Sequence, residues 1–112
     1  MSDCLFCKIA KGEIQAKIVK KGSGCVAIED INPQAPVHIL VIPEQHVADV
    51  LEATGRGILE GVFKLANEIA REKELVPRGF RQVINCGVEG GQTVPHLHLH
   101  LLGGRPMHWP PG

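Results

Sequence analysis

Residues 95–104 read PHLHLHLLGG and place three of the chain's six histidines within five positions. Polar and apolar residues alternate strictly from His96 to Leu101, and this two-residue period is typical of a half-buried β-strand. The three histidines are therefore predicted to share one face of the strand, with the leucines on the other. Histidines can decorate a solvated strand face, but three in register between glycine-rich segments indicate a chemical role.

The rest of the chain predicts an α+β fold, in which one long helix packs on a face of an antiparallel sheet of about five strands. Apolar residues at helical spacing indicate the long helix at residues 58–75 and a short helix at residues 5–10. The other strands are expected at residues 17–20, 25–29, 37–42 and 80–86, the first two forming a hairpin around Gly22-Ser23-Gly24.

The 112 residues suffice for one hydrophobic core, and we expect a single domain over residues 1–112. The 12 basic and 12 acidic residues cancel, which argues against a basic surface for nucleic acid or for an anionic membrane. The sequence shows neither a secretory signal nor an apolar stretch long enough to span a membrane. We therefore expect a soluble, cytoplasmic protein that holds any anionic ligand locally.

The geometry of a strand helps to interpret the histidine row. Alternate side chains on one face are roughly 6.6 Å apart, so three imidazoles of a straight strand converge on one metal ion only with difficulty. A phosphate with its nucleophile and leaving group in line fits such a row better. The central His98 is then the natural nucleophile, provided that its other nitrogen is held as a donor by a carbonyl or a side chain. His100 and His38 can donate to phosphate oxygens or relay protons.

The loop before the histidine strand, residues 87–94, is consistent with this chemistry. Its three glycines allow backbone N–H groups to approach an anion closely, and Thr93 adds a hydroxyl group just before the strand. Asp30 directly follows the strand predicted at residues 25–29. Its carboxylate can accept hydrogen bonds from a ribose diol or serve as a turn residue, and the sequence leaves both roles open.

Cys4 and Cys7 form a Cys-x-x-Cys pair, which is half of a tetrahedral zinc site. A redox motif would place the pair on a helix that follows a strand, and no strand is predicted before Cys4. Because no secretory signal is present, metal binding or free thiols are favoured over disulfides for the four cysteines.

The segment His96-Leu97-His98-Leu99-His100-Leu101-Leu102 resembles the signature of the histidine triad superfamily of nucleotide hydrolases and transferases. The similarity covers nearly the whole chain. The Hint branch is indicated by Leu5-Phe6-Cys7-Lys8-Ile9, Glu29-Asp30-Ile31, Gln34-Ala35-Pro36, residues 37–43, Gly90-Gly91-Gln92 and the tail at residues 103–112. Members of that branch are homodimers that hydrolyse purine nucleoside 5′-phosphoramidates to an amine and a nucleoside monophosphate.

The resemblance implies the same activity here, with a purine nucleotide as ligand, no cofactor required for catalysis, and a homodimer with a continuous sheet. It implies a covalent nucleotidyl group on His98. The other implied catalytic residues are His96, His100, His38 and Thr93. The implied substrate contacts are Asp30 at the ribose, Asn85, Gly91 and Gln92 at the phosphate end, Ile9, Ile14, Ile28 and Ile31 around the purine, and Trp109 of the tail at the partner subunit's active site.

Bacterial relatives that carry a similar cysteine pair bind a structural zinc, and the resemblance implies the ligands Cys4, Cys7, His46 and His96. As a ligand, His96 would fix the strand beside the nucleophile instead of relaying protons. Asn32, Thr93 and Pro95 depart from the branch, which frequently has serine, serine and an aromatic residue there. Thr93 keeps the hydroxyl group, so we expect activity to survive.

Three other functions are compatible with these residues. A dinucleoside polyphosphate hydrolase would use the same histidines, although the tail resembles the Hint branch instead. A nucleotide-binding or partner-binding module would use the same pocket with incidental catalysis. A catalytic metal site on His96 and His98 is permitted by their spacing, but the segment lacks a carboxylate that could serve as general base.

Overall fold

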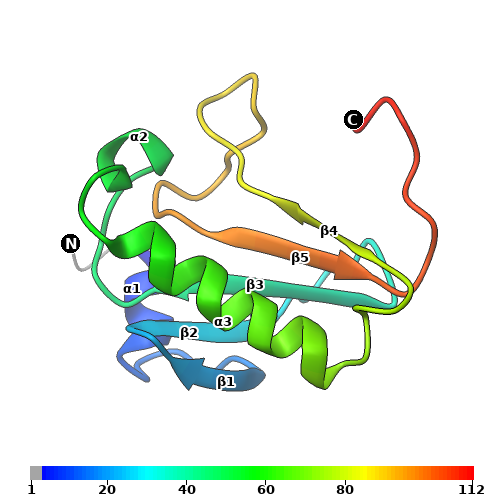
Figure 1. The fold of residues 1–112 in the computed structure, drawn as a ribbon. Helices are drawn as coiled ribbons and strands as arrows, with labels where there is room; N and C mark the ends of the chain where they lie inside the picture. Colours follow the sequence, from blue (N-terminus) through cyan, green and yellow to red (C-terminus); the bar gives the residue numbers. More distant parts are fainter. Residues whose placement is uncertain (1–3) are drawn as a thin grey trace.

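The computed structural model describes residues 4–112, and its five strands form one antiparallel sheet in the order β1-β2-β3-β5-β4 (Figure 1). The elements in chain order are α1 (Leu5–Ala10), β1 (Ile18–Gly22), β2 (Cys25–Glu29), β3 (Val37–Pro43), α2 (Val50–Ala53), α3 (Ile58–Glu72), β4 (Phe80–Val83) and β5 (Leu99–Gly103). The predicted α+β class and the five-stranded antiparallel sheet are confirmed. Residues 1–3, on which part of the signal-peptide argument rests, lie outside the described residues.

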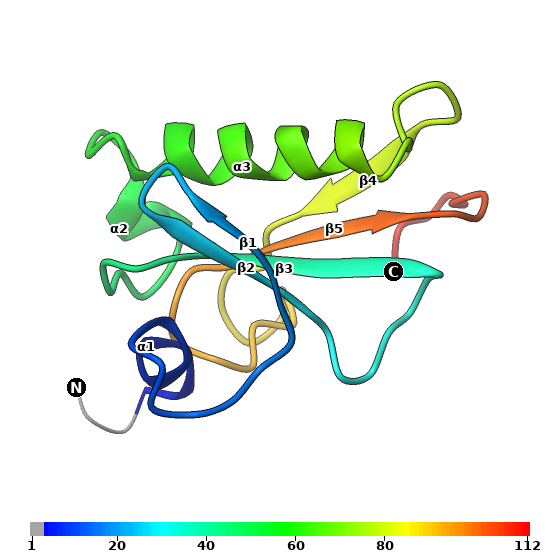
Figure 2. The ribbon, with the colours of Figure 1, turned by 90° about the horizontal axis from the view of Figure 1, so that it is seen from below.

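The two faces of the sheet are covered by different helices (Figure 2). Helix α3 packs on one face, where its Leu65 and Ile69 join a buried cluster with Leu99 and Leu101 of β5. Helix α1 lies on the other face, where Phe6 packs in a second cluster that includes residues of β2 and β3. The leucines of the alternating segment therefore face α3, and the histidines lie on the side of α1.

Helix α3 ends at Glu72 rather than at the predicted Leu75. Glu74 adopts a left-handed conformation with φ 61°, and the Leu75 N–H donates to the Ala70 carbonyl at 2.9 Å, a helix-ending arrangement. Leu75 is nevertheless buried, which explains why the apolar pattern extends beyond the helix.

The strands around the histidines are also shorter than predicted. Strand β5 begins at Leu99, because the N–H groups of His96 and Leu97 donate to Val94 and Val47 in loops and not to a neighbouring strand. Strand β4 stops at Val83, which is paired with His100, because β5 offers little ladder beyond that point. His96 and His98 therefore precede the regular ladder, although the alternation of faces continues through them.

The short helix α2 was not expected from the sequence. Its first turn is capped by Asp49, whose Oδ1 accepts from the Glu52 N–H at 3.0 Å, while Glu52 Oε1 accepts from the Ala48 N–H at 2.6 Å.

Among the described residues, no helix combines the length and apolar composition needed to cross a membrane.

Candidate functional site: a histidine cluster beside a Cys/His centre

The imidazole of His98 is buried and held in one tautomer. Its Nδ1 lies 2.8 Å from the backbone carbonyl of His96, so Nδ1 must carry the proton and donate it. In residues 4–112 no hydrogen bond engages Nε2, and no buried side-chain nitrogen or oxygen lacks a partner. A buried Nε2 without a partner would be an exception to this, so Nε2 must be accessible to solvent. Its lone pair is free, which is the state that a histidine nucleophile needs.

His38 and His100 form a hydrogen-bonded pair next to this ring. The Gln34 N–H donates to His38 Nδ1 at 3.0 Å, so the proton of a neutral His38 must be on Nε2. That nitrogen is 3.0 Å from His100 Nδ1 and 3.4 Å from Asp30 Oδ2. His100 therefore accepts at Nδ1 and carries its own proton on Nε2, where it can donate to a bound anion.

Burial keeps these histidines neutral. It lowers the pKa of His98 and of His38, an effect that the negative charge of Asp30 opposes in both. Burial also lowers the pKa of His100 to about 4, and repulsion from His98 and His38 adds to this shift. Near neutral pH the cluster therefore presents one lone pair and one N–H donor, without a positive charge on any of the three rings.

Asp30, His38 and His100 lie close enough to hold a metal ion, because their candidate ligand atoms are all within 4.8 Å of one another. The hydrogen bonds argue against this use. A His38 ring that accepts at Nδ1 has no lone pair left on Nε2 unless it loses its last proton. His38 and His100 are thus better described as members of a hydrogen-bond chain that starts at the Gln34 N–H, with the Asp30 carboxylate beside His38.

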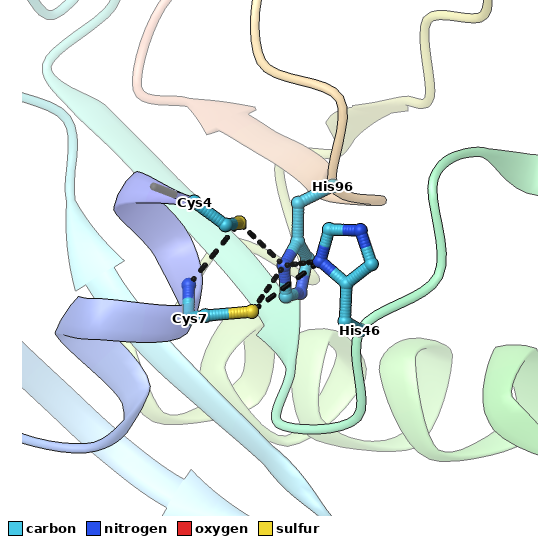
Figure 3. Close-up of side chains that lie close together, drawn as sticks. All are labelled: Cys4, Cys7, His46 and His96. Carbon is cyan, nitrogen blue, oxygen red and sulfur yellow. Dashed lines mark hydrogen bonds between the residues drawn. The ribbon is translucent and has the colours of Figure 1, made fainter. Parts of the chain in front are cut away.

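A second cluster, the Cys/His centre of Cys4, Cys7, His46 and His96, lies at the end of the histidine row (Figure 3). The cysteines come from the start of α1, His46 from the loop after β3, and His96 from the segment before β5. His96 Nδ1 is 3.2 Å from Cys4 Sγ, 3.6 Å from Cys7 Sγ and 3.2 Å from His46 Nδ1. The structure thus brings together all four residues that the resemblance implied.

This donor set fits a tetrahedral metal ion. Zinc bonded to sulfur and nitrogen at its usual distances separates the two ligand atoms by about 3.6 Å, close to the distances found here. The His96 Nε2 lies 2.8 Å from the Pro43 carbonyl and must donate to it, which leaves the lone pair on Nδ1, inside the centre. His96 thus points its lone pair into the Cys/His centre.

The loop at residues 87–94 uses part of its hydrogen-bonding capacity internally. The N–H groups of Gly91 and Gln92 donate to Val88 and Gly87 at 3.0 Å each, so these two amides are not available to surround an anion. The Gln92 side chain donates to Ala48 and Val94 carbonyls and accepts from the Gly87 N–H. Its visible role is to tie the loop to the segment before α2.

Thr93 and Asn85 lie in the same region, and within the described residues their side chains make no hydrogen bonds. Thr93 is exposed, and within the described chain neither its hydroxyl group nor its backbone N–H has a hydrogen bond. Asn85 is half-buried, and its Nδ2 lies 3.9 Å from where a Cβ on Gly91 would stand. Thr93 therefore offers free donors at the edge of a cavity of about 520 Å³ that also borders Cys4 and His46.

The isoleucines predicted to surround a purine divide into two groups. Ile9 and Ile28 are buried together in the cluster under α1. Ile14 is 37% exposed and Ile31 is 100% exposed, and neither belongs to that cluster.

Asp30 next to Ile31 fills the turn role, since its Oδ1 accepts from the Asn32 N–H at 2.8 Å. Its carboxylate also faces His38, and its predicted ribose contact stays a prediction.

The tail is fixed by two arginines and leaves its tryptophan exposed. Arg105 Nε donates to the Gln34 carbonyl at 3.1 Å, and Arg81 of β4 donates to the His108 carbonyl at 2.9 Å. Trp109 is 81% exposed. The tail is thus held against the body of the chain at His108, while the indole faces outward.

Sequence reasoning missed three contributors to the site. Phe6 packs against the rings of both His96 and His98, and the Gln34 N–H and Pro43 carbonyl fix histidine tautomers. Phe6 carried a signal, since it lies between the two cysteines. The two backbone groups carried none, because any residue has them.

Comparison with known proteins gives one consistent result. The family model of the HIT domain matches residues 11–107. An uncharacterised HIT-like protein of Synechococcus elongatus is 51% identical over 98% of this chain and 97% of its own. A 14 kDa zinc-binding protein of Zea mays is 42% identical over 99% of this chain and 89% of its own.

Among solved structures, a HIT family hydrolase from Legionella pneumophila Philadelphia 1 has a TM-score of 0.94 at 46% identity, covering 98% of this chain and 100% of that one. Sequence and fold agree over nearly the full length, so the chain belongs to the HIT domain family.

Proposed function

We propose that this protein hydrolyses the phosphorus–nitrogen bond of purine nucleoside 5′-phosphoramidates through a nucleotidyl group on His98. The observation that carries the proposal is the state of this ring: Nδ1 is held as a donor by the His96 carbonyl, and Nε2 is free and accessible. The similarity of this chain to a protein named as a HIT family hydrolase supports hydrolysis in general. The phosphoramidate substrate is inferred from the likeness of motifs and tail to the Hint branch.

The proposed reaction has two steps. The lone pair of His98 Nε2 attacks phosphorus and forms a bond to it, and the bond between phosphorus and the leaving nitrogen breaks as that nitrogen takes a proton from solvent. The ring then carries a positive charge, which the hydrogen bond from Nδ1 to the His96 carbonyl stabilises. Water then attacks phosphorus, the bond between phosphorus and Nε2 breaks, and the ring is neutral again; the proton that the water loses replaces the one taken from solvent. In total one water is consumed, its hydroxyl group bound to phosphorus and its proton to the amine.

His100 is proposed to stabilise the charge on the phosphate oxygens. Its Nδ1 accepts from His38, which leaves the Nε2–H for a bound anion. His38 holds this tautomer, and the Gln34 N–H in turn holds His38. Thr93 is proposed to contact the phosphate or the leaving amine, because its hydroxyl group and N–H are free.

The Cys/His centre is proposed to hold a structural zinc ion. The donor set, the distances and the tautomer of His96 fit this metal. A similar chain that is named as a zinc-binding protein supports the choice of zinc. Bound zinc would cross-link α1, the loop after β3 and the segment before β5, and the reaction needs no chemistry from it.

We also propose a cytoplasmic homodimer with a continuous sheet. Strand β4 is an edge strand, so its outer backbone groups are open to pairing with a second copy. The exposed Trp109 at the end of the arginine-anchored tail is then available to the partner subunit's active site.

The test is hydrolysis of adenosine 5′-phosphoramidate by the wild-type protein and by His98→Asn, after free metal has been removed by gel filtration. We expect ammonia and adenosine monophosphate from the wild type, and a rate at least about a thousandfold lower from the variant. Binding of adenosine monophosphate by both proteins is the control for folding. A folded wild type that binds the nucleotide and releases no ammonia would contradict the proposal; diadenosine polyphosphates would be the next substrates to assay.

A further inference from the structure

Phe6 contacts the histidine cluster and has no part in the chemistry above. It lies on α1 between two ligands of the Cys/His centre, and only 5% of it is exposed. Its ring centroid is 4.9 Å from that of His98, with 77° between the planes, and 5.9 Å from that of His96, with 78° between the planes. An edge-to-face contact of this kind is a favourable arrangement for two aromatic rings.

The ring of His98 is held from three directions. The His96 carbonyl fixes Nδ1, the ring of His100 lies 5.0 Å away at 58°, and Phe6 occupies a further side. A rotation of the imidazole about its bond to Cβ would break the hydrogen bond and drive the ring toward its aromatic neighbours. Without Phe6, that rotation would meet less resistance.

The helix that carries Phe6 is itself anchored beside this ring. Cys4 caps α1 by accepting from the Cys7 N–H at 3.4 Å. The thiol of Cys4 faces His96, and that of Cys7 faces His46 at 3.3 Å. The Cys/His centre is therefore connected to both groups that hold the ring of His98. His96 belongs to the centre and supplies the carbonyl, and Phe6 lies next to Cys7 on α1.

We propose that Phe6 is a positioning residue for the nucleophile, whose ring keeps the imidazole of His98 turned with Nε2 toward the substrate. This inference rests on the proposed function. It predicts that Phe6 acts on the rate of the chemical step and not on nucleotide affinity.

The experiment compares Phe6→Leu with Val26→Ala, in protein preparations matched for bound zinc. Val26 is a fair control because it is fully buried in the same cluster as Phe6, on β2, with β3 between it and β5. We expect Phe6→Leu to lower kcat for adenosine 5′-phosphoramidate by about tenfold or more, because misplaced reacting groups lose rate steeply. KM and the Kd for adenosine monophosphate should change by less than about twofold.

Nuclear magnetic resonance of the histidine side chains gives a readout that does not need turnover. In the wild type, the Nδ1–H of His98 should be a sharp, slowly exchanging signal, because it is buried and bonded to a carbonyl. Phe6→Leu should broaden or lose this signal, whereas Val26→Ala should lower the Tm and keep both the signal and kcat. Phe6→Met replaces Phe6→Leu if the latter does not fold.

Several results would overturn the inference. A raised KM with unchanged kcat would make Phe6 a wall of the nucleotide pocket, and equal losses of kcat in both variants would make its role purely structural. If the wild type hydrolyses no phosphoramidate, the proposed function fails. The inference then fails as well only if the His98 signal of Phe6→Leu matches that of the wild type.

Discussion

At the scale of single residues, the site depends on which nitrogen of each histidine carries the proton. Backbone groups decide this for His98, His38 and His96, through the carbonyl of His96, the N–H of Gln34 and the carbonyl of Pro43. The sequence predicts that His98 needs such a partner without identifying it. A backbone carbonyl or N–H leaves no trace in the residue pattern, so these assignments required the fold.

The pKa of His100, lowered to about 4 mainly by burial, predicts a pH-dependent stability. The unfolded chain binds a proton at this residue near pH 6.5, whereas the folded chain does not, so stability is full above that pH and falls as pH decreases toward 4. Between pH 7 and pH 5, the free energy of unfolding of the wild type should decrease by about 2 kcal/mol more than that of His100→Gln.

Urea unfolding at the two pH values measures this difference. The comparison isolates His100, because the two proteins share the other histidines and the residues of the Cys/His centre. Equal losses of stability in the two proteins would mean that burial does not suppress protonation of His100.

At the scale of elements, the alternating segment and the long helix are predicted well because each has one clean period. The leucines of the segment and the apolar residues of α3 meet in one buried cluster. The predicted ends of the elements are less accurate. The apolar pattern of α3 extends to Leu75, although the helix ends at Glu72. The apolar pattern of β4 extends through residues 84–86, which have no strand to pair with. Burial sets the pattern, whereas backbone hydrogen bonds set the ends.

Gly61 is required where α3 crosses the β1–β2 hairpin. A Cβ at this position would lie 2.4 Å from the backbone carbonyl oxygen of Ser23, which is too close for any side chain. Gly61→Ala should therefore lower the free energy of unfolding by about 1–3 kcal/mol, despite the higher helix propensity of alanine. The exposed Lys64→Ala, one turn later, is the control and should change it by less than about 0.5 kcal/mol. A Gly61→Ala protein as stable as the wild type would show that the helix moves freely over the hairpin.

The Cys/His centre predicts a difference between two cysteine variants. Cys4→Ser removes one of the four proposed zinc ligands, so we expect loss of stoichiometric zinc and a Tm lower by about 10 °C or more. Cys86→Ser is the control, because Cys86 lies outside the centre, and it should keep both zinc and Tm. Metal analysis and thermal unfolding check the two outcomes. Zinc retained at full occupancy in Cys4→Ser would contradict the assignment of the ligands.

At the scale of the whole molecule, residues far apart in sequence meet on the face of the sheet opposite α3. Cys4 and Cys7 contact His96, which is about 90 residues away in the sequence. They meet because α1 packs on that face of the sheet. The resemblance to a known family predicts the meeting of the four ligands; local patterns alone do not, because neither cysteine shares an element with a histidine. Ile31 and Trp109 are exposed, and their predicted contacts with the purine and with the partner subunit's active site stay predictions.

The tail gives a prediction that depends on the proposed dimer. Deleting residues 107–112 removes Trp109 and the His108 carbonyl that Arg81 binds. We expect the ratio of kcat/KM between phosphoramidates with aromatic and with small amines to change by about fivefold or more. Deleting Gly112 alone is the control and should leave the ratio unchanged. An unchanged ratio in the longer deletion would remove the tail from leaving-group selection.

The central claim is that His98 forms a covalent intermediate, and the stereochemistry at phosphorus tests it most directly. One diastereomer of an adenosine 5′-thiophosphoramidate is hydrolysed in water enriched in ¹⁸O, and the configuration of the product is determined. Two successive in-line displacements, first by His98 and then by water, predict retention of configuration. Inversion would mean that water attacks the substrate directly, and it would contradict the account.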